Sequence, residues 1–78
     1  MAKKNAPKPS DEAVYKVVEI VGSSPVSWEA AARAAVESAA RTLRDLRIAE
    51  ITKLDMKIGD GKVVAFRARV SLSFKYDG

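Results

Sequence analysis

The stretch that decides the fold is residues 63–75, VVAFRARVSLSFK, in which apolar and polar side chains alternate almost without error. Successive side chains of a β-strand point to opposite faces of a sheet, so the pattern predicts a strand with one buried and one open face. The open face carries Arg67, Arg69 and Lys75. We expect function or assembly to involve this face.

Two further segments have β-character. Residues 13–21, AVYKVVEIV, are rich in β-branched side chains and precede the turn formers of residues 22–25, GSSP. Residues 48–58, IAEITKLDMKI, predict another strand. The following Gly59-Asp60-Gly61 supplies the positive-φ residues of a tight hairpin turn that leads into residues 63–75.

Between the first two strands, residues 27–46, SWEAAARAAVESAARTLRDL, predict a helix of about five turns. Ser27 is the expected N-cap, and Glu29 lies in the first turn, where the helix dipole favours an anion. Small side chains dominate the expected buried stripe, so the helix can lie close to a sheet. The stripe consists of Trp28, Ala32, Ala35, Val36, Ala39 and Leu43.

The order β-α-β-β predicts an α+β fold: a three-stranded antiparallel sheet with its last strand in the middle, order 1-3-2, and one helix on one face. A hairpin centred on the Asp60-Gly61 turn sets an approximate register, which a β-bulge would shift. The expected pairs are Leu54 with Arg67, Thr52 with Arg69, Glu50 with Ser71, and Ile48 with Ser73.

Residues 1–12 contain two prolines and three lysines and predict a disordered tail, which leaves residues 13–78 as one small domain. Ordering about 66 residues costs on the order of 100 kcal/mol in conformational entropy, which is close to the free energy that burial of so small a core provides. The chain has no cysteine and no histidine, so disulfides and thiolate or imidazole metal sites cannot supplement that core. Oligomerisation is therefore expected.

The same composition limits the function classes. Without histidine or cysteine, acid-base chemistry would depend on Asp, Glu, Lys or Tyr, so an enzyme is not expected. The net charge is +4, but Lys3, Lys4 and Lys8 all lie in the tail, and the cationic strand lacks interleaved aromatic residues, which argues against nucleic-acid binding. No apolar run approaches the roughly 20 residues of a membrane span. We expect a cytoplasmic protein that does not associate with membranes.

The chain from residue 13 to residue 77 resembles the dodecin family. The resemblance rests on YKVVEIVGSSP at residues 15–25, TLRDLR at residues 42–47 and the final strand. It is closest to the subgroup called calcium dodecins, through Ser27-Trp28-Glu29, Asp55-Met56 and Phe66-Arg67. The resemblance implies a hollow homododecamer that binds a small ligand or ion between subunits, as storage or protection rather than catalysis.

Two positions that match the flavin pocket of the family hold other residues here. A tryptophan that stacks on the flavin is replaced by Ile48, and a glutamine that hydrogen-bonds its edge is replaced by Arg67. Ile48 has no π-face, and arginine donates hydrogen bonds without accepting any. Flavin bound in the usual way is therefore not expected; the alternative is a flavin-storing dodecin with an altered pocket.

Calcium is a candidate ligand through the resemblance. Calcium takes six to eight oxygen ligands, and no loop in this chain offers them. Copies of one carboxylate around a symmetry axis could form a site in the assembly, and the candidates are Glu50, Asp55 and Asp60. Asp60 also has a simpler interpretation, as a turn residue.

Three other features allow two interpretations each. Arg67 and Arg69 could bind a phosphate or form ion pairs with Glu50, Glu19 or Asp55, and we favour ion pairs. Trp28 could be a displaced flavin platform or a core residue, and we favour the core. The lysine-rich tail, repeated twelve times, could instead give a purely structural cage avidity for an acidic partner.

Overall fold

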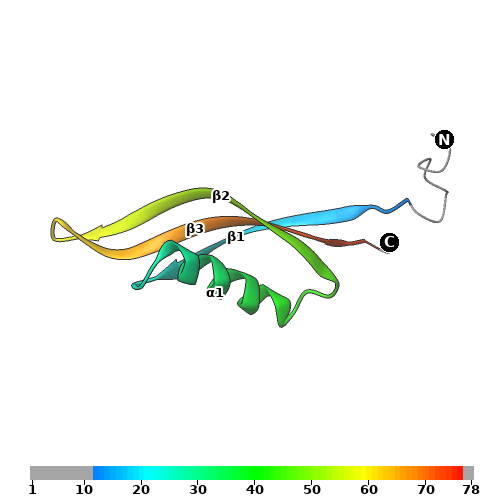
Figure 1. Cartoon of the computed structure of the whole chain (residues 1–78), viewed down its shortest axis with the longest axis horizontal. Helices are drawn as coiled ribbons and strands as arrows, with labels where there is room; N and C mark the ends of the chain where they lie inside the picture. Colours follow the sequence, from blue (N-terminus) through cyan, green and yellow to red (C-terminus); the bar gives the residue numbers. More distant parts are fainter. Residues whose placement is uncertain (1–11, 77–78) are drawn as a thin grey trace, which may run out of the picture.

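The computed structural model describes residues 12–76; residues 1–11 and 77–78 lie outside the described part, and most of the predicted tail lies among them. The described chain has the predicted β-α-β-β order (Figure 1). Its elements are β1 (Tyr15–Ser24), α1 (Trp28–Ala40), β2 (Leu46–Gly59) and β3 (Lys62–Lys75).

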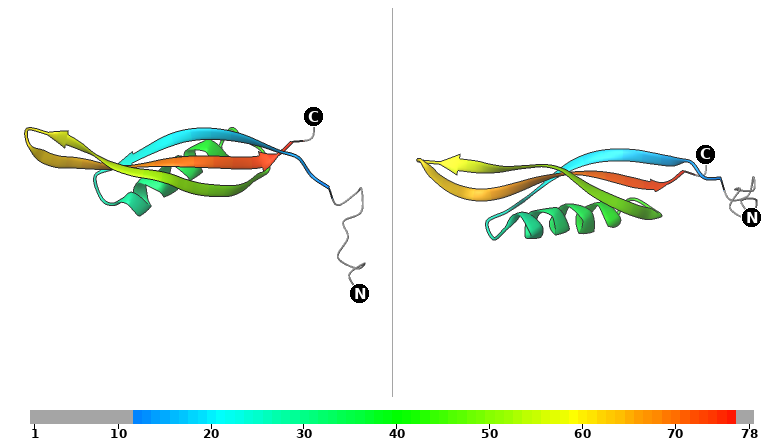
Figure 2. Two further views of the ribbon diagram at one scale, coloured as in Figure 1. Left: turned by 90° about the horizontal axis from the view of Figure 1, so that it is seen from above. Right: turned by 45° about the horizontal axis from the view of Figure 1, so that its top comes forward.

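The sheet has the predicted topology. β3 lies in the centre and pairs antiparallel with both β1 and β2, in the order β1-β3-β2. α1 lies on one face of the sheet and leaves the other face open (Figure 2). The alternation in β3 has the predicted consequence: Ala68, Val70 and Leu72 are fully buried on the helix side, whereas Arg67 and Arg69 are exposed.

α1 approaches β1 closely at Gly22. A Cβ atom at this position would lie 2.0 Å from the carbonyl oxygen of Ala31 and 2.9 Å from the Cβ of Ala35. Only glycine fits between the strand and the helix here. Ala31, Ala32 and Ala35 are the buried residues of α1, so the alanine stripe predicted from the sequence packs as expected, with Ala31 in addition to the predicted set.

The helix begins as predicted but ends early. The Ser27 side chain accepts a hydrogen bond of 3.0 Å from the Ala30 N–H, which confirms the N-cap. The last helical residue is Ala40, not Leu46. The N–H groups of Arg41 and Thr42 donate to carbonyls three residues back, those of Ser38 and Ala39, and these bonds tighten the final turn. Asp45 then takes a left-handed φ of 56°, a conformation that Asp tolerates better than most residues.

β1 lies further along the chain than the predicted residues 13–21, because it begins at Tyr15 rather than Ala13. It continues three residues past Val21 to Ser24, because Gly22, Ser23 and Ser24 pair with β3 opposite Ala68, Arg67 and Phe66. Ladder hydrogen bonds therefore outweigh the low strand propensity of glycine and serine at this end.

Half of the predicted hairpin register is confirmed, and half is wrong. Ile48 lies opposite Ser73 and Glu50 opposite Ser71, as expected. A bulge between Ile51 and Lys53 then shifts the pairing by one residue. Arg67 consequently faces Asp55 rather than Leu54, and Arg69 faces Lys53 rather than Thr52. The shift moves Leu54 to the helix side of the sheet and brings Asp55 to the open face.

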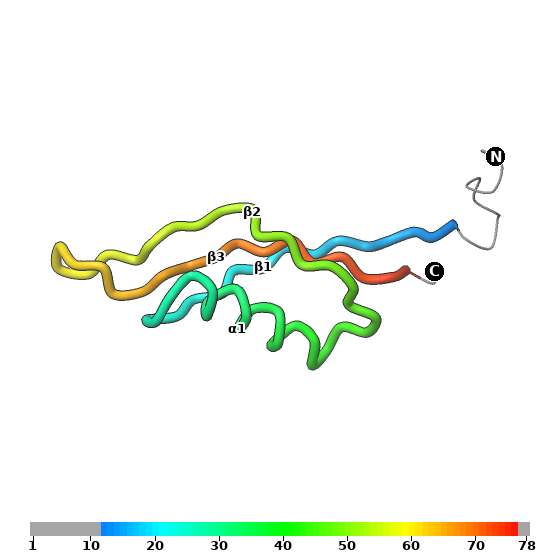
Figure 3. Tube along the Cα trace, in the orientation of Figure 1, coloured from blue at the N-terminus to red at the C-terminus, as the bar shows by residue number. Residues whose placement is uncertain are grey.

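The end of the β2–β3 hairpin extends beyond α1 and β1 (Figure 3). Asp60 and Gly61 form its two-residue turn with φ values of 51° and 75°, which confirms the predicted turn and the turn role of Asp60. The Cα radius of gyration is 17.1 Å, compared with about 11 Å for a compact domain of similar length. One copy is therefore far from compact. Within residues 12–76, no helix is long and apolar enough to cross a lipid bilayer.

Candidate functional site

The open face of the sheet is a lattice of four rows, each with one residue from β1, β3 and β2. Side chains that lie opposite one another on neighbouring strands share a face, so the strand register assigns the rows. From the hairpin end they are Ser23–Arg67–Asp55, Val21–Arg69–Lys53, Glu19–Ser71–Glu50 and Val17–Ser73–Ile48. Polar and apolar side chains mix on this face, as they do at subunit interfaces.

Arg67 and Asp55 form the best-defined polar contact of the face. The Arg67 Nε donates to Asp55 Oδ1 at 2.7 Å, and Nη2 donates to Oδ2 at 2.8 Å, so the pair is bidentate. The hydrogen bond from Arg67 lowers the pKa of Asp55, and the same bond raises the pKa of Arg67. The two side chains are 45% and 52% exposed, so solvent screens the pair and its contribution to stability is modest.

Asp55 also connects the open face to the helix side. Its backbone carbonyl accepts a hydrogen bond of 3.0 Å from the Trp28 indole Nε1–H. The Trp28 ring meets Phe66 edge to face, with a centroid distance of 5.1 Å and an interplanar angle of 68°. Trp28 is 36% exposed, so it packs at the rim of the core rather than inside it. Its contacts place it on the helix side, away from the open face.

The second row is more basic than the first. Arg69 lies opposite Lys53, and its nearest acidic partner is Glu19, at 4.0 Å from Nη1 to Oε1. The Thr52 hydroxyl, displaced by the bulge, donates to the Arg69 carbonyl at 3.3 Å. Of the predicted acidic partners, Asp55 and Glu19 pair with the two arginines within the described chain, and Glu50 does not.

The structure does not bring Ile48 and Arg67 together within one copy. Ile48 lies opposite Ser73, six residues along β3 from Arg67. At about 3.3 Å per residue the two positions are about 20 Å apart. Ile48 is 57% exposed at its end of the face. A pocket that uses both positions has to draw them from different copies of the chain.

The candidate metal ligands are also separated within one copy. Asp60 lies at the hairpin turn, Glu50 lies in the third row, and Asp55 has both carboxylate oxygens occupied by Arg67. Among residues 12–76 there is no cluster of three or more His, Cys, Asp or Glu side chains able to hold a metal ion.

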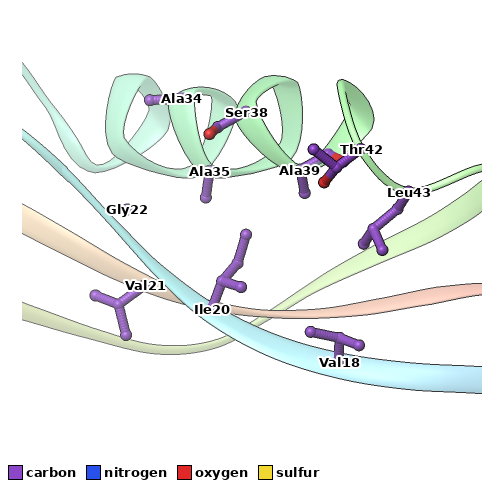
Figure 4. A pocket seen from close by; sticks show the side chains of 10 residues that line it. All are labelled: Val18, Ile20, Val21, Gly22, Ala34, Ala35, Ser38, Ala39, Thr42 and Leu43. Atoms are coloured by element: carbon purple, nitrogen blue, oxygen red, sulfur yellow. The ribbon is translucent and has the colours of Figure 1, made fainter.

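A groove that the sequence did not reveal runs between α1 and β1 on the helix side (Figure 4). It is an open hollow with a volume of about 650 Å³. Most of its lining is apolar, with Val18 and Ile20 from β1 and Leu43 after α1. The sequence signal was present in Gly22 and the alanine stripe, because small side chains leave space beside a closely packed helix.

Comparison with known proteins agrees with these features. Residues 14–77 match the family model described as Dodecin. The chain is 40% identical over 62 residues to the calcium dodecin of Mycobacterium tuberculosis, covering 80% of this chain and 87% of the relative. It is 36% identical over 64 residues to the dodecin of Thermus thermophilus, covering 82% of this chain and 93% of the relative.

Solved structures show the same fold. The dodecin of Streptomyces coelicolor superposes with a TM-score of 0.79 at 36% identity, covering 85% of this chain and 94% of that one. The crystal structure of M. tuberculosis calcium dodecin, described as calcium chelating with a novel calcium-binding site, has a TM-score of 0.73 at 42% identity, covering 82% and 91%. The sequence match, the strand order and these superpositions agree, and the chain belongs to the dodecin family.

Proposed function

We propose that this protein is a non-enzymatic, homododecameric hollow shell that binds or sequesters small ligands or ions, including calcium, at the interfaces between subunits. Family membership supports the shell, and the similarity to a relative named calcium dodecin supports calcium as a ligand. The cytoplasmic location expected from the sequence remains part of this proposal.

Assembly follows from how little one copy buries. The core of the described chain consists of six residues, three of them alanines of α1. Many large apolar side chains remain more than a third exposed, among them Val17, Ile51 and Met56. Burial of apolar surface is the main favourable term in folding, at about 25 cal/mol per Å². The chain has no cysteine or histidine that could supplement this small core through a disulfide or a metal site. We therefore expect the exposed apolar side chains to be buried against neighbouring copies.

The separation of Ile48 and Arg67 is the single observation that supports placing the ligand site between subunits. The two residues match the flavin-contacting positions of the family, yet about 20 Å of β3 separates them in one copy. A ligand of ordinary size cannot touch both within one subunit. The ligand site at these positions therefore lies between copies, and its composition depends on assembly.

Calcium binding requires the same assembly. With no acidic cluster in the described part of one copy, the oxygen ligands have to come from several copies around an axis. Glu50 and Asp60 are better candidates than Asp55, whose two oxygens already accept hydrogen bonds from Arg67. Recruiting Asp55 would leave the Arg67 guanidinium without its partner.

Flavin storage with an altered pocket is the weaker proposal. The tryptophan of this chain lies on the helix side against Phe66 and cannot replace the aromatic platform missing at Ile48 on the open face. Titration of riboflavin or FMN with protein separates the two proposals. A shell without the platform leaves flavin fluorescence nearly unchanged, and strong quenching would favour flavin storage.

Two measurements test the main proposal. Light scattering or native mass spectrometry of the full chain at micromolar concentration should give about twelve subunits, and a monomer would refute the shell. Calorimetric titration with Ca²⁺ should show binding that Glu50→Gln or Asp60→Asn weakens. Glu37→Gln, on the exposed side of α1, is the matched control and should bind as the parent does. Equal affinity in all four proteins would reject the proposed ligands.

A further inference from the structure

α1 does not cover the sheet evenly. It packs on β1 and β3 and barely touches β2. Ile51, Leu54 and Met56 of β2 lie opposite Val70, Ala68 and Phe66, so they point to the helix side, although the helix does not cover them. Val64 continues the same parity of β3. We call Ile51, Leu54 and Met56 the β2 strip; their exposures are 51%, 52% and 45%, and Val64 of β3 is 47% exposed.

The α1–β1 groove lies on the other flank of the same helix (Figure 4). Among residues 12–76, its lining contains no ionisable side chain, and its polar side chains are the hydroxyls of Ser38 and Thr42. The Thr42 hydroxyl already donates to the Ala39 carbonyl at 3.3 Å. Charged ligands would find no partner there. The small residues Gly22, Ala35 and Ala39 leave a hollow that larger apolar side chains can fill.

The two surfaces are alike in chemistry, because both are mainly apolar, and both run along the strands. The β2 strip extends over six residues from Ile51 to Met56, about 17 Å at the rise of a strand. The part of α1 that lines the groove runs from Ala34 to Ala39, about 8 Å, and Thr42 and Leu43 follow it. The strand floor from Val18 to Gly22 is about 13 Å long. Because α1 separates the two surfaces, the strip and the groove of one copy cannot cover each other.

We propose that the β2 strip of one copy packs into the α1–β1 groove of a second copy, as a head-to-tail contact that closes into a ring. This inference rests on the proposed shell and names the surfaces that join its subunits. Each copy offers one strip and one groove, so every copy in a closed ring uses both. The contact covers Leu54 and Met56, which are 52% and 45% exposed within the described part of one copy.

Cross-linking between introduced thiols tests the contact, because the chain has no cysteine of its own. The full-length variant Ser38→Cys/Met56→Cys is treated with a short bis-maleimide after its native mass has been measured. Ser38 is an exposed residue that lines the groove, and Met56 is in the strip. We expect most of the monomer band to be lost to covalent multimers ending at the size of the ring. Peptide mass spectrometry should identify the 38–56 link between chains.

The matched control is Glu37→Cys/Met56→Cys, in which the helix thiol is moved by one residue to an exposed position outside the groove lining. It should leave the monomer band largely intact. Dimers formed efficiently by Met56→Cys alone would show strip against strip and overturn the head-to-tail contact. An oligomer of the expected mass without the 38–56 link would overturn this inference alone. A monomeric parent protein would overturn the proposed shell as well.

Discussion

Replacing Gly22 with alanine tests how closely α1 lies on β1. The new Cβ would lie 2.0 Å from the Ala31 carbonyl oxygen, whereas ordinary contacts are about 3.5 Å. The helix must therefore withdraw by about 1 to 1.5 Å. The obstructing atom belongs to the helix backbone and cannot rotate away, so the cost lies near the upper end of the 1–3 kcal/mol typical of overpacking. Alanine also reduces unfolded-state entropy, which offsets about 0.4–1 kcal/mol. We expect a net destabilisation of about 2 kcal/mol.

Gly61→Ala is the control. Gly61 has a φ of 75°, and no atom of residues 12–76 lies within 4 Å of an added Cβ, so this variant reports backbone strain alone, about 1–2 kcal/mol. Unfolding in urea is followed by circular dichroism at one matched protein concentration, because the stability of an oligomer depends on concentration. Trp28 fluorescence gives a second readout that distinguishes the variants. Withdrawal of α1 should loosen the indole contact with Phe66 in Gly22→Ala and leave it unchanged in Gly61→Ala.

A Gly22→Ala protein with wild-type stability and an unchanged Trp28 spectrum would refute the close-approach reasoning. It would mean that strand and helix separate here without loss of packing. The groove should also change, because Gly22 is part of its lining. If the proposed contact is correct, Gly22→Ala should lower the thermal stability of the assembly more than Gly61→Ala does.

The remaining predictions concern the open face, the tryptophan and the tail. The folded-state pKa of Asp55 lies below its ordinary value of 3.8, so the Arg67 pair stabilises the protein above that pH, and the effect is lost as pH falls through the lowered pKa. In Asp55→Asn, the urea concentration at the midpoint of unfolding should therefore fall less as the pH is lowered. If this pH dependence is unchanged, the Asp55–Arg67 pair is not its cause. Trp28→Phe removes the indole donor to Asp55 but keeps an aromatic ring beside Phe66, and should cost about 1 kcal/mol by circular dichroism; no loss would mean that the hydrogen bond contributes nothing. Ile48→Trp combined with Arg67→Gln should restore flavin quenching that the parent lacks, and no gain would undermine the match of these positions to the family pocket. Deleting residues 1–12 should leave the native subunit number unchanged. If the tail provides avidity for an acidic partner, the same deletion should abolish that binding, and persistent binding would exclude the tail.

The main features of the fold were predictable because they depend on local patterns. The alternation of residues 63–75 assigns each residue of β3 to a face, and Asp60-Gly61 forms the expected hairpin turn. Ser27 caps α1 through its neighbouring backbone. β2 and β3 form a hairpin, and α1 connects β1 to β2. These connections favour β3 as the central strand, which gives the order β1-β3-β2.

The ends of elements and the register depended on more distant contacts. α1 stops at Ala40 although the arginines and leucines of residues 41–46 favour helix, because Asp45 takes a left-handed conformation and the chain turns back to begin β2. Strand pairing recruits Gly22 to Ser24 into β1 against their propensity. A bulge has no sequence signal of its own here, so the position at which β2 shifts past Ile51 could not be read from the hairpin pattern.

The sequence by itself therefore determined the elements, their order, the two faces of β3 and the family to which the chain belongs. Only the tertiary structure decided the site. A one-residue bulge placed Asp55 rather than Leu54 beside Arg67, and close helix packing at Gly22 placed the groove on one flank of α1 and the β2 strip on the other. The physical reason is the range of the interactions. Periodicity and turn chemistry act between near neighbours, whereas register and helix position are set by contacts between residues far apart in the chain.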